Sequence, residues 1–246
     1  MLDLLIETLV VRHGLANATD VLLSGGSAGG LSTFLHADRV QSLLREHGAP
    51  LRVFKAAPVS GFFALHSDGS GAPVYPNEMK YVFEMQNCSG GVNQACIASL
   101  PAAERWRCIF ANYSYAHTTT SMFPLQSTVD SWQMGNIWRA DAACAKDDFK
   151  NCTAQEVDAL NGYAHDLIAD LRRVDKFGRA GEGGFVESCL EHVAAQGAMF
   201  NKYMLDGLTE QAAISRWWHS EAGAPADWHL PCDLSEKVPH QCNPTC

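Results

Sequence analysis

The stretch DVLLSGGSAGGLSTFLHADRVQSLLREHG, residues 20–48, decides the fold of this chain. Its apolar run at 21–24 predicts a short buried strand, and apolar residues at helical spacing over 31–47 predict a helix after a glycine-rich turn. The next apolar run, LRVFKAA at 51–57, predicts a second strand that ends at Pro58. Strand, turn, helix and strand in this order indicate an α/β fold with a mainly parallel sheet flanked by helices.

Outside this stretch the pattern is uneven. Residues 2–11 predict a short apolar helix with one face formed by Leu2, Leu5, Ile6 and Leu9. Residues 60–120 show little periodicity and contain three cysteines, as expected for an insertion or lid held by disulfides. The short apolar segment 122–126 ends at a polar turn.

The second half contains the clearest helix. Thr153-Ala154-Gln155-Glu156 is a capping box, and apolar residues then recur at helical spacing up to Val174. Residues 184–188 predict a last strand, and the part from Asp227 onward reads as a loop rich in Cys and Pro. No linker divides the chain, so residues 1–246 are interpreted as a single domain.

Composition excludes several classes of function. The 246 residues are 47% hydrophobic and 18% charged, which supports a packed core and excludes a disordered chain. The formal net charge is -9, and the absence of a Lys/Arg stripe argues against nucleic-acid binding. No apolar run reaches the roughly 18 residues that a transmembrane helix requires.

The cysteines indicate an oxidising compartment. There are nine of them, without the paired C-x-x-C motifs of a zinc ribbon, so disulfides are the better interpretation. Cys144 and Cys152 are spaced for a small-loop disulfide, and Cys189 is expected to pair with one of the last three cysteines. An odd number leaves one thiol over or a partner outside the chain.

Glycosylation sequons support the same compartment. They begin at Asn17, Asn87, Asn112 and Asn151. The first residues, MLDLL, lack the features of a signal peptide. A secreted, extracellular or cell-wall protein whose front end is truncated is therefore expected.

The turn at the end of the first strand contains the pattern G-x-S-x-G. A serine at a sharp strand-to-helix turn needs small neighbours, here Gly25, Gly26 and Gly29, and its hydroxyl is exposed as a nucleophile. The amide of Ala28 points toward the oxyanion that forms when Ser27 attacks a carbonyl. A phosphate-binding loop is the alternative, but the G-K-S/T of a Walker loop and the spacing of G-x-G-x-x-G are both missing.

A serine nucleophile requires a histidine base, which in this fold follows the acid along the chain. His192 comes after the last predicted strand, beside Cys189. His165 lies on an amphipathic helix, whereas His36 and His47 lie on the helix after Ser27 and point away from the turn. Position alone favours His192 without excluding the others.

The acid is placed by the same reasoning. Asp130 directly follows the apolar segment 122–126 and its polar turn. Asp141, Asp147 and Asp148 lie in polar, linker-like sequence and are interpreted as solvated charges. Large aromatic residues, Trp132, Trp217 and Trp218, are available for a pocket but are more typical of packing.

Four segments together resemble the pectin acetylesterase family, which includes the animal Wnt deacylase Notum. The stretch LSGGSAGGLSTFLH (23–36) is similar to the nucleophile segment of that family, and DSWQMGNI (130–137) to its acid segment. ESCLEH (187–192) resembles the histidine segment and CNPTC (242–246) the C-terminal signature. The resemblance implies an α/β-hydrolase-like fold, secretion, disulfides and a Ser27–Asp130–His192 catalytic triad.

The chain also departs from the family pattern. Family members often have cysteines where this chain has Gly26 and Ala37, and plant members usually have one where it has Val193. The family has a long region before the serine, including a loop that supplies further oxyanion amides, and this chain has 26 residues there. We therefore expect the N-terminal strands and part of the oxyanion hole to be missing.

These observations predict a serine esterase that removes acetyl or other acyl groups from cell-wall-type polysaccharide through an acyl-enzyme. The alternatives are a Notum-like lipid or protein deacylase and a non-catalytic, glycan-binding relative. No cofactor and no metal ion are expected, and the partner is an acylated polysaccharide or another ester substrate.

Overall fold

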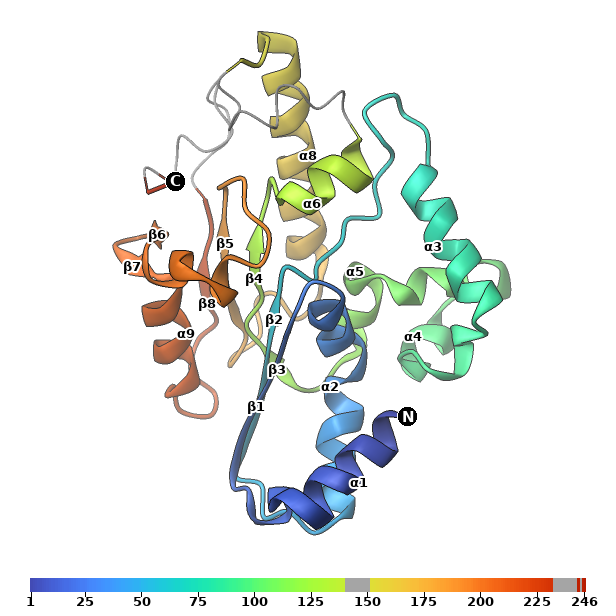
Figure 1. The fold of residues 1–246 in the computed structure, drawn as a ribbon, viewed down its shortest axis with the longest axis vertical. Coiled ribbons are helices and arrows are strands. Elements are labelled where there is room, and N and C mark those ends of the chain that lie inside the picture. The colour runs from blue at the N-terminus through green and yellow to red at the C-terminus, as the bar shows by residue number, and fades with distance from the viewer. Residues whose placement is uncertain (140–150, 232–242, 244) are drawn as a thin grey trace.

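The computed structural model describes residues 1–139, 151–231, 243, 245 and 246. Its main sheet has six strands in the order β1-β2-β4-β5-β8, with β3 also beside β2 (Figure 1). The strands of this sheet are β1 (Asp20–Gly26), β2 (Val53–Val59), β3 (Ser121–Met122), β4 (Leu125–Ser127), β5 (Gly183–Glu187) and β8 (Asp227–His229). All of their pairings are parallel, which confirms the predicted fold class. A separate antiparallel pair is formed by β6 (Met204–Leu205) and β7 (Leu208–Thr209).

Helices cover both faces of the sheet. The helices are α1 (Leu2–His13), α2 (Ala28–Glu46), α3 (Val74–Met85), α4 (Gln94–Ser99), α5 (Ala111–Ser114), α6 (Ser131–Gln133), α8 (Ala154–Arg173) and α9 (Glu210–Trp218). Short 3-10 or π turns are η1 (Leu15–Asn17), η2 (Cys88–Gly90), η3 (Ala102–Ile109), η4 (Tyr115–His117), η5 (Met134–Trp138), η6 (Ala194–Gln196) and η7 (Ala198–Asn201). None of the helices in the described part of the chain is long and apolar enough to span a membrane.

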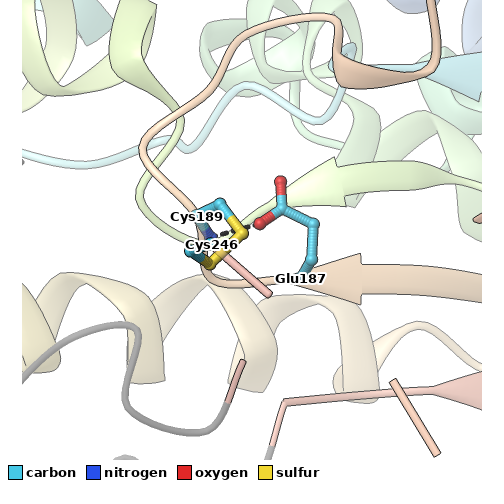
Figure 2. Close-up of side chains that lie close together, drawn as sticks. All are labelled: Glu187, Cys189 and Cys246. Carbon is cyan, nitrogen blue, oxygen red and sulfur yellow. Dashed lines mark hydrogen bonds between the residues drawn. A yellow bond between two sulfur atoms is a disulfide. The ribbon is translucent and has the colours of Figure 1, made fainter. Parts of the chain in front are cut away.

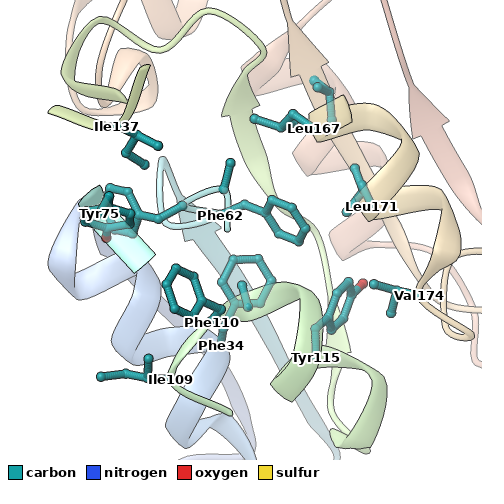
Figure 3. Packing of buried hydrophobic residues seen from close by; sticks show 14 of the residues in the cluster. Phe34, Phe62, Tyr75, Ile109, Phe110, Tyr115, Ile137, Leu167, Leu171 and Val174 are labelled. Carbon is teal, nitrogen blue, oxygen red and sulfur yellow. The ribbon is translucent and has the colours of Figure 1, made fainter. Parts of the chain in front are cut away.

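The alternating side chains of β5 pack against the helices on the two opposite faces of the sheet. Val186 packs into the large cluster formed with α2, α5 and α8, whereas its neighbour Phe185 packs into a second cluster with α9. Because successive side chains of a strand point to opposite faces, both faces of β5 are buried. In the large cluster Phe34 contacts the ring of Tyr115 at a centroid distance of 5.3 Å (Figure 3).

The helix predicted after the capping box is confirmed as α8. The hydroxyl of Thr153 accepts from the amide of Glu156, and the Glu156 carboxylate accepts from the amide of Thr153. The periodic residues Leu160 and Leu167 are fully buried, whereas His165, on the same amphipathic helix, is exposed.

Three predictions for the first part of the chain are wrong in detail. β1 is only partly buried, with Leu22 42% exposed, because β2 is its sole partner among the described strands. β2 continues through Pro58. Residue 58 is paired with neither β3 nor β4, so the missing amide of the proline breaks no hydrogen bond to these strands. The face that α1 buries contains Ile6 and Val10, while Leu5 is 55% exposed.

One later prediction is supported and another is wrong. The segment 60–120 contains a disulfide, as predicted, which joins Cys96 to Cys108, and the segment is largely helical. β5 is not the last strand, because β8 lies within the part predicted as a loop and pairs with β5.

The cysteine predictions are partly tested. Cys189 pairs with Cys246, which confirms that it pairs with one of the last three cysteines. Cys152 is disulfide-bonded, but its predicted partner Cys144 lies outside the described residues. Among the described cysteines, Cys88 is the free thiol.

Candidate active site

Ser27 occupies the turn between β1 and α2, as the sequence predicts. Its backbone has φ 58° and ψ −122°, a strained conformation for a residue with a side chain, and its amide donates to the carbonyl of Val59 at 2.9 Å. Ala28 is the first residue of α2, so its N–H has no acceptor within the helix. The helix N-terminus therefore directs a free amide and a partial positive charge toward the space beside Ser27.

The glycines around Ser27 are not equivalent. A Cβ at Gly25 would lie 2.6 Å from the carbonyl oxygen of Gly29, and one at Gly30 would lie 2.4 Å from that of Val59. At Gly29 itself a Cβ would meet nothing within 4 Å. The expectation that packing excludes a side chain at each flanking position is therefore wrong for Gly29, and Gly30 has that requirement instead.

The structure brings the three predicted residues together. The Nε2 of His192 lies 2.8 Å from the Oγ of Ser27, and its Nδ1 lies 2.7 Å from Oδ2 of Asp130. Each residue follows the carboxyl end of a strand, which is β1 for Ser27, β4 for Asp130 and β5 for His192. In a parallel sheet these ends meet at one edge, so residues distant in sequence become neighbours.

Asp130 is held in place by hydrogen bonds to the carboxylate oxygen that does not face His192. Its Oδ1 accepts from the amides of Trp132 and Gln133, both at 3.0 Å, which caps the short helix α6. The residue is fully buried, and Oδ2 is left to face the imidazole of His192. That hydrogen bond raises the pKa of His192 above its ordinary value, although partial burial acts in the opposite direction.

The other candidates lie elsewhere. His36 is on α2, where burial lowers its pKa, and His47 caps the end of that helix. Asp141, Asp147 and Asp148 lie outside the described residues.

The loop that carries His192 is anchored by contacts that sequence reasoning missed, because they join residues distant along the chain. Val193 has φ 58°, and its amide donates to the Oγ of Ser60 at 2.9 Å. The Oγ of Ser127, at the end of β4, donates to the carbonyl of Cys189 at 2.5 Å. The histidine loop is thus hydrogen-bonded to the residue that follows β2 and to the end of β4.

Trp132 lies next to the imidazole of His192. The two rings are stacked with centroids 6.4 Å apart and planes at 30°. The rings of Trp132 and Phe63 meet in a T-shaped arrangement with centroids 5.1 Å apart. Trp217, in contrast, is a core residue that packs on Phe123. Of these two tryptophans, Trp132 is the one that borders the candidate site.

A cluster of potential metal ligands lies under the same loop. Glu187 lies beside the disulfide of Cys189 and Cys246, and its carboxylate accepts from the amide of Cys189 (Figure 2). Because both sulfur atoms are in the disulfide, neither offers the thiolate that a metal ion would require. Burial raises the pKa of Glu187 well above its ordinary value, which favours the neutral acid here.

The chain is similar to known esterases over its whole length. Residues 1–246 match the family model described as Pectinacetylesterase. Pectin acetylesterase 11 of Arabidopsis thaliana is 26% identical over 248 residues, which cover 96% of this chain and 59% of that protein. The palmitoleoyl-protein carboxylesterase NOTUM of Homo sapiens is 25% identical over 250 residues, covering 96% of this chain and 47% of that protein.

A solved structure shows the same fold. The Wnt deacylase Notum from Drosophila superposes with a TM-score of 0.75 at 23% identity, covering 100% of this chain and 64% of that one. The chain therefore spans less than two thirds of the length of each of these relatives.

Proposed function

The chain belongs to the pectinacetylesterase family, and we propose on this premise that it is a serine carboxylic ester hydrolase whose triad is Ser27, Asp130 and His192. The observation that carries the proposal is the pair of hydrogen bonds around His192, 2.8 Å to Ser27 and 2.7 Å to Asp130. When a serine hydroxyl, an imidazole and a buried carboxylate are hydrogen-bonded in this order, the imidazole can activate the serine as a nucleophile.

The reaction follows from these contacts. The Oγ of Ser27 attacks the ester carbonyl while Nε2 of His192 removes its proton, and Asp130 holds the imidazole in the required tautomer. The amide of Ala28 donates to the oxyanion of the tetrahedral intermediate. His192 then gives its proton to the leaving alcohol, and the acyl group stays on Ser27.

Deacylation repeats the steps with water. His192 removes a proton from a water molecule as its oxygen attacks the acyl-enzyme carbonyl, and returns that proton to Oγ when the bond to Ser27 breaks. The products are a carboxylic acid and a regenerated serine.

We propose acetyl groups of cell-wall-type polysaccharide as the substrate, in agreement with the names of the plant relatives. The animal relatives are named palmitoleoyl-protein carboxylesterases, which makes removal of a long acyl chain the competing activity. Hydrolysis rates on p-nitrophenyl acetate and p-nitrophenyl octanoate distinguish the two.

We also propose that residues 1–246 act as one catalytic domain in a secreted, extracellular or cell-wall protein. The disulfides Cys96–Cys108 and Cys189–Cys246 support an oxidising compartment. The sequon residues Asn17, Asn87 and Asn151 are exposed, as glycan attachment requires.

The direct test is labelling by a fluorophosphonate, which reacts with activated serines, followed by peptide mass spectrometry. We expect the adduct on Ser27, and we expect Ser27→Ala to lose both the label and esterase turnover. Ser32→Ala, on the exposed surface of α2, is the matched control and should label like the wild type. Labelling of Ser27→Ala at the wild-type rate would overturn the triad.

A further inference from the structure

Gln196 lies against the residue that precedes the proposed nucleophile. It is the last residue of η6, four positions after His192. Its Nε2, Cδ and Oε1 atoms lie 2.1, 2.6 and 2.9 Å from the point where a Cβ of residue 26 would be. The carboxamide therefore fills the space that Gly26 leaves beside Ser27.

The backbone of Gln196 is held in position by hydrogen bonds. The amide of Gln196 donates to the carbonyl of Val193 at 2.8 Å, and the amide of Val193 donates to Ser60. The loop from His192 to Gln196 is thus anchored to the residue that follows β2.

The carboxamide itself is available to a ligand. Gln196 is exposed, and no described residue makes a hydrogen bond with its side chain. A primary amide offers two donors and an acceptor, which match the hydroxyl groups of a sugar.

The chemistry decides which half of the substrate it meets. His192 gives its proton to the leaving alcohol, so that half of the ester lies on the side of the histidine loop. The carbonyl oxygen turns instead toward the amide of Ala28 at the start of α2. Gln196 is on the histidine loop and so borders the alcohol half.

We propose that Gln196 hydrogen-bonds the leaving alcohol and makes the enzyme selective for esters of polyhydroxy alcohols such as sugars. This proposal rests on the triad proposed above. It assigns a substrate contact to a residue outside the triad.

The test compares kcat/KM on 6-O-acetylglucose with kcat/KM on p-nitrophenyl acetate, whose alcohol half has no hydroxyl groups to bind. We expect the ratio of the two values to fall about tenfold in Gln196→Ala, the loss typical of one or two hydrogen bonds. Gln196→Met keeps the volume over Gly26 without the amide, and should lower the ratio equally. Gln211→Ala on the exposed surface of α9 is the control and should keep the wild-type ratio.

A second variant tests the position of the carboxamide. In Gly26→Ala the new Cβ displaces the flexible end of Gln196, so the ratio should fall as in Gln196→Ala. Combined with Gln196→Ala, it should cause no further fall.

The outcomes separate the two proposals. A ratio within twofold of wild type in both Gln196→Ala and Gln196→Met overturns the role of Gln196. The fraction of active enzyme cancels in this ratio, because the same molecules hydrolyse both substrates. Turnover that persists in Ser27→Ala overturns the triad, whatever the ratio.

Discussion

At the scale of single residues, the Asp130–His192 pair controls the pH dependence of the site. His192 must be neutral to accept the proton of Ser27, and its hydrogen bond to Asp130 raises its pKa above the ordinary value of 6.5. The rate of fluorophosphonate labelling should therefore rise with pH through this raised pKa.

In Asp130→Asn the main cause of the raised pKa is gone, so the acidic limb of the labelling profile should move to lower pH. The maximum rate should fall about 10⁴-fold because the imidazole loses its fixed tautomer. Asp166→Asn, which changes an exposed carboxylate beside His66, should leave the profile unchanged. An unshifted limb in Asp130→Asn would show that Asp130 does not act on His192.

Glu210 makes the stability of the protein depend on pH. It begins α9, it is 1% exposed, and its Oε2 has no hydrogen-bond partner among the described residues. Burial raises its pKa from 4.5 to about 8, so the folded state prefers the neutral acid. Stability is therefore greatest below pH 4.5 with respect to this group and is lost as the pH rises toward 8.

We expect Glu210→Gln to weaken this pH dependence. The free energy of unfolding should fall between pH 5 and pH 8 in the wild type, and this fall should be smaller by about 2–4 kcal/mol in Glu210→Gln. Urea unfolding at the two pH values measures the difference, and Glu221→Gln, at an exposed position, is the control. If the wild type and Glu210→Gln lose the same free energy of unfolding between the two pH values, ionisation of Glu210 does not destabilise the folded protein.

At the scale of secondary-structure elements, the approach of α2 to the loop after β2 depends on glycine. A Cβ at Gly30 would meet the Val59 carbonyl at 2.4 Å, and one at Gly61 would meet the backbone of Gly30 at 2.2 Å. Both contacts are with backbone atoms, which cannot move aside as a flexible side chain can.

Gly30→Ala should therefore destabilise the protein by about 2–4 kcal/mol. Gly29→Ala is the matched control one position earlier, because a Cβ there meets nothing within 4 Å. Guanidinium unfolding measures both, and similar midpoints for the two variants would contradict the close approach of α2 to the loop.

Local signals explain which elements could be predicted from the sequence. α8 combines a capping box with a long apolar repeat, so both its start and its buried face were predicted. The turn at Ser27 was predicted because a glycine-rich stretch follows an apolar run. β8 has three residues and is defined by pairing with β5, which is distant in sequence, so no local signal marked it.

Non-local contacts explain the remaining misses. Whether β1 is buried depends on which strands lie beside it, and the residues of β1 do not reveal this. The meeting of Asp130 and His192 could be proposed by family resemblance, but position alone left other residues open. The contact of Gln196 with Gly26 joins η6 to the end of β1, which are distant in sequence, and has no signature in the sequence.

At the scale of the whole molecule, the C-terminus is tied to the proposed active site. The disulfide of Cys189 and Cys246 joins residues 57 positions apart, and Cys189 is three residues before His192. Its carbonyl also accepts from Ser127 of β4, near the loop of Asp130. Loss of the disulfide should thus reduce both stability and the order of the histidine loop.

We expect Cys189→Ala/Cys246→Ala to lose about 4 kcal/mol of stability, since closing a loop of this length restricts the unfolded chain strongly. Its labelling by fluorophosphonate should also slow under conditions where the variant is still folded. Cys96→Ala/Cys108→Ala removes a bridge that spans 12 positions and lies away from the histidine loop, so it should lose about 3 kcal/mol and label at the wild-type rate. If both double variants label equally fast, the disulfide at the C-terminus stabilises the fold without ordering the loop of His192.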